Sequence, residues 1–280
     1  MRLITWNVQW GKGCDGIVDP RRIAHDVAAM GGADILCFQE MSCRFDELDG
    51  GVDQDRIFAE LFPYHRSIFR PAVERHEGDV VRRFGNMTFS RFPVRQVSNH
   101  LLPWPAASSV KSMRRHALEV VIETPLGPVR VTNTHLEFHS DEQRRAQVER
   151  LVALQDEAVR GEKPVKSSAR EPYAASSLVQ SAILCGDFNL EPDDPLYNSL
   201  DQPERGDAFY RDVWRLAHPG EPHAPTCGIF DADQWPKGPN CRDFVFVSGD
   251  LGRRIARVTV DDQTSSSDHQ PVLVAFRIPS

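Results

Sequence analysis

Short apolar segments of strand length alternate with amphipathic segments of helical period along most of this 280-residue chain. The segments expected to form strands are residues 3–8, 35–38, 87–89, 94–101, 118–122, 129–134, 182–185, 243–247, 255–260 and 272–276. Alternation of this kind is typical of an α/β protein in which helices cover the faces of sheets. No solenoid-like repeat interrupts the pattern, so we expect one domain over residues 1–280.

Local signals place three helices between these strands. Asp19 and Pro20 are a helix cap and a first-turn proline, so a helix is expected to begin there. Residues 57–62 carry the apolar stripe of a second helix. Ser140 and Gln143 form a capping box that opens a third.

Two polar segments lack a clear period. Residues 161–177 are rich in Ser, Ala and Pro and are expected to form a mobile loop. Residues 66–95 carry seven arginines against three acidic residues. This excess indicates either a solvated charged loop or a surface that faces phosphate.

Charge and cysteine content limit the partners and the compartment. The net charge of −7 argues against non-specific binding of duplex DNA, which usually needs a basic surplus. No apolar run is long enough to span a bilayer, and residues 1–7 are strand-like rather than signal-like. The six cysteines include no C-x-x-C pair, which argues against a structural zinc site. We expect a cytoplasmic protein without disulfides, and we favour a monomer.

Polar residues interrupt or end several of the apolar strands, at the positions Asn7, Glu40, His135, Asp187, Asn189, Asp243, Asp268 and His269. Each has an ordinary explanation by itself, such as a turn, a cap or a hydrogen-bonded core residue. Strand ends meet at the edge of a sheet, however, where such groups can converge. Together they are the side chains that hydrolysis of a phosphate ester requires.

The chemistry assigns a candidate role to each residue. Mg²⁺ prefers carboxylate oxygens, which Glu40 and Asp268 offer. In-line attack on phosphorus needs an oriented water, which a carboxylate beside an amide, Asp187 with Asn189, can supply. A histidine held by a carboxylate can donate to a phosphate oxygen or transfer a proton, which suits His269 with Asp243. His135 is a second candidate contact.

Seven motifs occur in the order typical of one superfamily. They are Thr5-Trp6-Asn7, Gln39-Glu40, Gly85-Asn86 with Ser90-Arg91-Phe92-Pro93, Asn133-Thr134-His135-Leu136, Gly186-Asp187-Phe188-Asn189, Arg242-Asp243-Phe244-Val245-Phe246-Val247 and Ser267-Asp268-His269. The chain thereby resembles the endonuclease/exonuclease/phosphatase superfamily, the deoxyribonuclease-I-like, metal-dependent phosphoesterases. One such motif would be weak evidence, but seven in order are strong.

The resemblance implies a four-layer α/β sandwich, in which two mixed, mostly antiparallel β-sheets pack face to face with helices outside. The site would lie at one edge of this sandwich. Glu40 would bind Mg²⁺ or Mn²⁺, with Asn7 and Asp268 in or next to the coordination shell.

The resemblance also implies roles around the phosphate. Asp187 would position or activate water, Asn189 would contact phosphate, and Asp243 would orient His269. His135 matches a histidine of deoxyribonuclease-like and sphingomyelinase-like members, whereas abasic-site nucleases commonly carry tyrosine there. Either Arg114 or Arg115 matches an arginine that contacts phosphate in some members.

The segment 226–238 precedes Asp243 and carries Trp235 among prolines and glycines. Trp235 could stack on a base of the substrate. The favoured alternative is a surface loop packed by its own aromatic residues.

Three functions are compatible with these residues. The leading hypothesis is a metal-dependent hydrolase of phosphodiesters, with nucleic acid as the expected substrate. The alternative is a phosphatase or phosphodiesterase for a small molecule or a lipid headgroup, which the acidic net charge favours. A non-catalytic protein on the same fold would be expected to lose the site residues, yet all of them are present.

Overall fold

The computed structural model describes residues 1–108, 110–161 and 179–279. Six strands form the first of two sheets: β1 (Arg2–Asn7), β2 (Ile35–Cys43), β3 (Arg66–Glu77), β4 (Val80–Ser90), β11 (Ile255–Val260) and β12 (Val272–Phe276). Their order across the sheet is β11-β12-β1-β2-β4-β3. Within it, β1 and β2 are parallel, and β1 is antiparallel to β12.

The second sheet also has six strands: β5 (Val94–Leu101), β6 (His116–Thr124), β7 (Gly127–His135), β8 (Ala182–Asp187), β9 (Tyr210–Asp212) and β10 (Asp243–Ser248). Their order is β5-β6-β7-β8-β10-β9. Here β7 and β8 are parallel, and β8 is antiparallel to β10. Both sheets thus have a parallel pair of strands near the centre.

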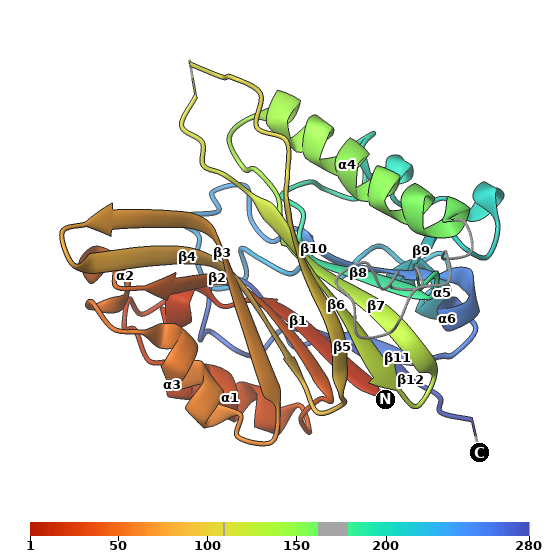
Figure 1. Cartoon of the computed structure of the whole chain (residues 1–280), viewed down its shortest axis with the longest axis horizontal. Coiled ribbons are helices and arrows are strands. Elements are labelled where there is room, and N and C mark those ends of the chain that lie inside the picture. Colours follow the sequence, from red (N-terminus) through yellow and green to blue (C-terminus); the bar gives the residue numbers. More distant parts are fainter. Residues whose placement is uncertain (109, 162–178, 280) are drawn as a thin grey trace, which may run out of the picture.

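The helices are α1 (Pro20–Ala29), α2 (Asp46–Asp49), α3 (Gln54–Leu61), α4 (Asp141–Arg160), α5 (Val213–Ala217) and α6 (Gly249–Gly252), and the 3₁₀ turns are η1 (Gln9–Gly11), η2 (Tyr197–Ser199) and η3 (Pro203–Arg205). Helices α1 and α3 lie against the outer face of the first sheet, and α4 crosses the outer face of the second (Figure 1). None of the helices in the described ranges is long and apolar enough to cross a membrane.

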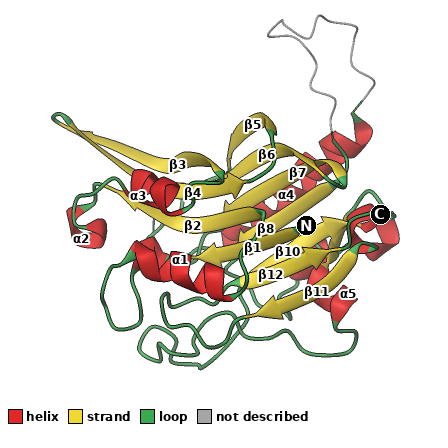
Figure 2. Ribbon diagram, turned by 90° about the horizontal axis from the view of Figure 1, so that it is seen from below, coloured by secondary structure: helices red, strands yellow, loops and turns green. Residues whose placement is uncertain are grey.

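Strand residues alternate between two apolar layers, as the pleat of a strand requires. Along β1, Leu3 packs between the sheets, whereas Ile4 packs against the helical side. Along β8, Ile183 packs between the sheets and Leu184 packs under α4. The result is the four-layer sandwich that the sequence motifs implied, with the two sheets lying face to face (Figure 2).

The predicted first residues of α1 and α4 are confirmed. Asp19 caps α1 by accepting from the amide of Arg21, and Pro20 is its first residue. Ser140 caps α4 by accepting from the amide of Gln143. Apart from Gly161, the loop expected for residues 161–177 lies outside the described residues.

Two strand predictions were wrong in extent. The strand expected to stop after residue 38 continues as β2 to Cys43, with an irregular register before Met41. The charged segment, for which a solvated loop was one of two interpretations, is largely the hairpin of β3 and β4, which projects from the sandwich (Figure 1). The outer half of β3 is exposed on both faces and that of β4 is only partly buried, so charged residues replace the apolar alternation by which a strand is recognised.

Gly186 permits close approach of the two parallel strands β7 and β8. Its φ is +141°, and a Cβ atom there would lie 1.8 Å from the carbonyl oxygen of Thr134. We expect Gly186→Ala to lower the free energy of unfolding by about 3 kcal/mol, because backbone must move in the centre of a sheet. Chemical denaturation measures this loss.

Gly127→Ala is the matched control. Gly127 also has positive φ, at +94°, but open space surrounds the position of its missing Cβ. The Gly127→Ala variant should lose only about 1–2 kcal/mol of unfolding free energy, which is the cost of the left-handed conformation. Equal losses in the two variants would contradict the steric explanation.

Candidate active site

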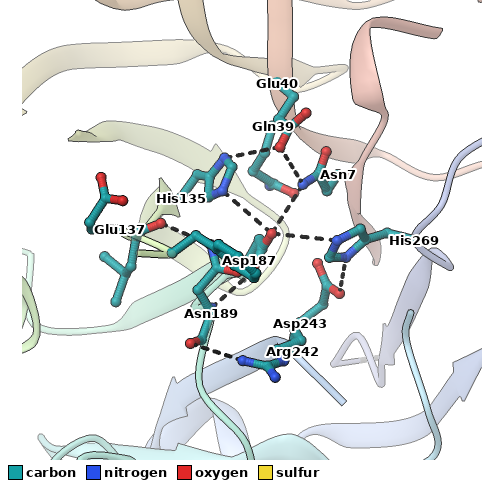
Figure 3. A network of polar contacts seen from close by, with 12 residues as sticks. Asn7, Gln39, Glu40, His135, Glu137, Asp187, Asn189, Arg242, Asp243 and His269 are labelled. Carbon is teal, nitrogen blue, oxygen red and sulfur yellow. Dashed lines mark hydrogen bonds and ion pairs between the residues drawn. The ribbon is translucent and has the colours of Figure 1, made fainter. Parts of the chain in front are cut away.

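The polar residues that end the central strands lie together at one edge of the sandwich (Figure 3). Asn7 is the last residue of β1, and His135 and Asp187 are the last residues of β7 and β8. Asp187 is paired with His135 on one side and with Asp243, the first residue of β10, on the other. His269 lies just before β12. The topology therefore brings together residues that are far apart in the sequence.

The side chain of Asn7 connects acidic groups of the two sheets. Its Nδ2 donates to Glu40 Oε1 at 3.1 Å and to Asp187 Oδ2 at 3.0 Å. Its Oδ1 accepts from the backbone amide of Gln9 at 3.1 Å. The buried amide is thus satisfied, which offsets the cost of an amide side chain within a buried strand.

Glu40 reaches the site because β2 is irregular at this point. The pairing of β2 with β4 shifts register between Phe38 and Met41, and Glu40 has a φ of 60°. The preceding Gln39 is buried between the sheets, where its Nε2 donates to Asn133 Oδ1 at 2.7 Å. A bulge of this kind re-aims a side chain, here Glu40, toward the edge of the sheet.

Both carboxylate oxygens of Asp187 are held in place. Oδ1 accepts from the backbone amide of Asn189 at 2.9 Å, and Oδ2 accepts from Asn7. The Nε2 atoms of His135 and His269 lie 3.5 and 3.7 Å from Oδ2. The two histidines approach this oxygen from opposite sides (Figure 3). Asp187 is therefore the central group of the cluster.

Asn189 shapes the turn after β8. Its φ is 51°, a left-handed conformation that asparagine tolerates. Its Nδ2 donates to the carbonyl of Leu136 at 2.9 Å, and its own carbonyl accepts from Arg242 Nη1 at 3.2 Å. The structure thus adds a role in holding Asp187, whereas the phosphate contact expected for Asn189 stays a prediction.

His269 and Asp243 form a buried pair. His269 Nδ1 lies 2.7 Å from Asp243 Oδ2. Trp6 Nε1 donates to the carbonyl of His269 at 2.8 Å, and the amide of Asp243 donates to Thr226 Oγ1 at 3.1 Å. The carboxylate fixes the imidazole so that Nε2 faces Asp187, which is the orientation that the proposed pairing requires.

Asp268 lies in the same acidic region and is bound by neighbouring polar side chains. Its Oδ2 accepts from Gln234 Nε2 at 2.6 Å, and its Oδ1 accepts from Ser267 Oγ at 3.3 Å. Its charge also raises the pKa of Glu40. The metal-binding roles expected for Asp268 and Asn7 stay predictions.

The two candidate arginines occupy different environments. Arg115 is 7% exposed, its Nε lies 3.4 Å from Glu137 Oε2, and its Nη1 has no hydrogen-bond partner among the described residues. Arg114 is exposed, and its guanidinium lies 4.8 Å from the ring centre of Trp104. Only Arg115 borders a cleft that Glu40 also borders.

Trp235 is buried against the site, where it packs on other aromatic rings. Its ring lies edge-on to His269 at 5.6 Å between ring centres and to Phe138 at 6.2 Å. The guanidinium of Arg242 lies 5.5 Å from the centre of the same ring. Trp235 thus forms a wall beside His269, and its expected stacking on a base stays a prediction.

Burial and neighbouring negative charge raise the pKa values of several acidic groups in the site. Burial and the charge of Asp268 raise the pKa of Glu40 to about 7, although Asn7 opposes the shift. Burial also raises the pKa of Asp243 to about 6, with His269 opposing it. Burial likewise raises the pKa of Asp268. These carboxyl groups are therefore harder to ionise than free ones, and a bound cation would favour their ionised forms.

The surroundings shift the pKa values of the two histidines in opposite directions. Burial and Arg115 hold the pKa of His135 well below its usual range, so this ring is neutral at neutral pH. Burial opposes protonation of His269, but Asp243 and Asp187 raise its pKa well above the usual range. Burial disfavours ionised Asp187 too, but the two histidines and its hydrogen bonds lower its pKa. An ionised Asp187 thus faces a protonated His269.

These residues fit a hard divalent cation. Glu40 is partly exposed, with 19% of its side chain accessible, and burial together with the charge of Asp268 raises its pKa. One oxygen of Asp243 is buried without a partner among the described residues. Ligand atoms of Asp187, Asp243 and His269 also lie within 4.8 Å of one another, but protonated His269 already pairs with Asp243 there, so the cation is expected at Glu40 instead. Carboxylate and amide oxygens are the donors that Mg²⁺ prefers.

Sequence reasoning missed the residues that support the site. Glu137, fully buried, pairs with Arg115, and Thr226 accepts from the amides of both Arg242 and Asp243. Gln234 holds Asp268. Glu137 could have been identified from its position, because it lies only two residues after His135. Thr226 and Gln234 lie in a loop without a recognisable pattern.

Known proteins share this architecture. The model of the endonuclease/exonuclease/phosphatase family matches residues 4–269. A search of curated proteins gave no match. Among solved structures, a protein of this family from Beutenbergia cavernae is 22% identical with a TM-score of 0.68, the match covering 99% of this chain and 71% of that one.

Two further solved structures are similar over nearly the whole of both chains. The Neisseria 3′ phosphatase NExo, bound to a product DNA hairpin, is 19% identical with a TM-score of 0.61, covering 99% of each chain. A mannosyl-6-phosphatase from Bacteroides thetaiotaomicron is 18% identical with a TM-score of 0.68, again covering 99% of each. At such identities the structures share the fold, while the family model matches most of the sequence. The chain therefore belongs to the endonuclease/exonuclease/phosphatase family.

Proposed function

We propose that this protein is a divalent-metal-dependent phosphoesterase that hydrolyses a phosphodiester bond in nucleic acid. The observation that carries the proposal is the environment of Asp187. Its carboxylate, ionised and fixed on both oxygens, lies within 3.7 Å of two histidines and shares a hydrogen-bond donor with Glu40. An acid and a base side by side at the edge of a sandwich are suited to in-line hydrolysis.

Glu40, with Asp268 and Asn7 beside it, would hold Mg²⁺ or Mn²⁺. When bound, the cation would neutralise charge that develops on the phosphate and its leaving oxygen. The raised pKa of Glu40 supports this placement, because a cation there would relieve the repulsion from Asp268. Glu40 is also the partly exposed member of the cluster, so solvent ions can reach it.

The remaining residues act on water and phosphate. Asp187 accepts a hydrogen bond from the attacking water and takes its proton. His269, protonated and fixed by Asp243, donates a hydrogen bond to a phosphate oxygen. Neutral His135 and the unpartnered Nη1 of Arg115 bind other phosphate oxygens.

Nucleic acid is our first choice of substrate, supported by the similarity to the DNA-bound Neisseria 3′ phosphatase. The second candidate is a phosphatase or phosphodiesterase for a small molecule. Two observations favour it: the net charge of −7 and the similarity to the mannosyl-6-phosphatase. Release of phosphate from monoesters without cleavage of diesters would select this second candidate.

Asp187→Asn tests the proposed base. The amide has almost the same shape but cannot take a proton, so kcat on a phosphodiester should fall by about 10²–10⁴-fold. Steady-state hydrolysis of a single-stranded oligonucleotide with Mg²⁺ or Mn²⁺ measures the loss, and thermal unfolding checks the fold. Asp193→Asn, at an exposed carboxylate in the following loop, is the control and should keep normal activity. A near-normal rate for Asp187→Asn would refute the assignment.

The neighbouring arginines allow a matched comparison. Lysine keeps the charge but loses the guanidinium fork, so Arg115→Lys should lower kcat/KM by about tenfold through loss of a charge-assisted hydrogen bond to phosphate. Arg114→Lys should change kcat/KM by less than about twofold, because an exposed residue outside the site makes little contribution. The assignment of Arg115 is wrong if the two variants respond equally.

A further inference from the structure

A cleft of about 390 Å³ opens beside the catalytic residues. Glu40 and Arg115 both line it, so a group attached to a phosphate bound beside them could extend directly into it. Its walls come from η1, from the segment after β2, from the β3–β4 hairpin and from the loop before β6. The cleft therefore has the position of a subsite for the group next to the scissile phosphate.

The walls of the cleft are largely aromatic and apolar. Trp10, Phe45 and Phe84 line it, together with Val73 and Met113, and all five are partly exposed. The ring centres of Trp10 and Phe84 lie 6.4 Å apart. Aromatic side chains in a partly open cleft offer flat surfaces on which a planar group can stack.

Trp10 is held in an uncommon backbone conformation. Its φ and ψ are 44° and 30°, in the left-handed region that bulky residues rarely adopt. The buried Gln54 stabilises this conformation by donating from Nε2 to the Trp10 carbonyl at 2.6 Å. Such conformations concentrate at ligand sites, where the surrounding structure maintains them.

Polar groups at the same cleft fit a nucleotide better than an acyl chain. Arg75 and Lys111 supply positive charge, whereas the side-chain amides of Gln9 and Gln234 are already paired, Gln9 with Gln234 and Gln234 with Asp268. An acyl chain would cover the two cationic side chains without offering them a partner. The volume suits a ligand of nucleotide size but not a base-paired duplex, so only an unpaired base could enter.

We propose that this cleft binds the unpaired nucleobase adjacent to the scissile phosphate, with Trp10 as its stacking surface. The substrate would then be single-stranded nucleic acid or a frayed end. The inference rests on the proposed phosphodiesterase activity and adds the class of substrate. It also agrees with the acidic net charge, because one stacked base needs fewer phosphate contacts than a duplex groove.

The test uses dinucleoside monophosphates, which contain a single phosphodiester. Thymidylyl-thymidine is compared with analogues in which a tetrahydrofuran replaces the nucleoside on one side or on both. The wild-type protein should cleave a diester with a base on the cleft side about 5- to 150-fold more efficiently than the base-free diester, measured as kcat/KM. Trp10→Ala should remove most of this preference, and Trp10→Phe should retain most of it.

Tyr64→Ala, which removes an exposed aromatic residue outside the cleft, is the control and should keep the full preference. Thermal unfolding of each variant checks its fold. A wild-type protein without preference for a base, or a preference that survives in Trp10→Ala, would overturn the inference. So would a Trp10-dependent preference for a short-chain phosphatidylcholine, which would mark a lipid site.

Failure of the proposed function gives a different result. In that case the wild-type protein with Mg²⁺ or Mn²⁺ would cleave neither the dinucleotides nor bis(p-nitrophenyl) phosphate, and this inference would fall with it. Cleavage of all diesters at equal rates would instead support the phosphodiesterase activity and refute only the binding of a base in the cleft.

Discussion

One amide side chain connects the acidic groups of the two sheets. Asn7 donates from a single nitrogen to Glu40 of β2 and to Asp187 of β8. Two carboxylates so close together in a buried place repel each other, and each pays a cost for leaving water. The hydrogen bonds from Asn7 reduce that cost without neutralising the charge, so the arrangement remains suited to a cation. His135 and His269 each lie within 3.7 Å of the same oxygen of Asp187.

Most of the fold could be predicted from the sequence, because strands buried on both faces have a strong apolar pattern. Leu3 and Ile4, or Ile183 and Leu184, pack on opposite faces and are all apolar. The β3–β4 hairpin carries no such pattern in its exposed outer half. The bulge before Met41 was also unpredictable, because it depends on pairing with β4 and on the hydrogen bond of Gln39 to Asn133 of the other sheet.

The sequence was enough to predict which residues belong to the candidate site. It was much less informative about which of them contact one another. Residues at strand ends could be identified because the chain order fixes which edge they share. The choice between Arg114 and Arg115 needed the structure, since only burial beside Glu137 and a place on the cleft separate them. Trp10 gave no sequence signal, because its exposure to the cleft depends on segments more than 30 residues away.

The proposed function requires a divalent cation at the edge of the sandwich, next to Glu40. Anomalous diffraction from crystals soaked in Mn²⁺ tests this most directly, because the signal locates the ion independently of catalysis. We predict a Mn²⁺ peak in contact with the Glu40 carboxylate that disappears in Glu40→Gln. A peak held by Asp187, Asp243 and His269 without Glu40, or no peak at this edge of the sandwich, would contradict the account.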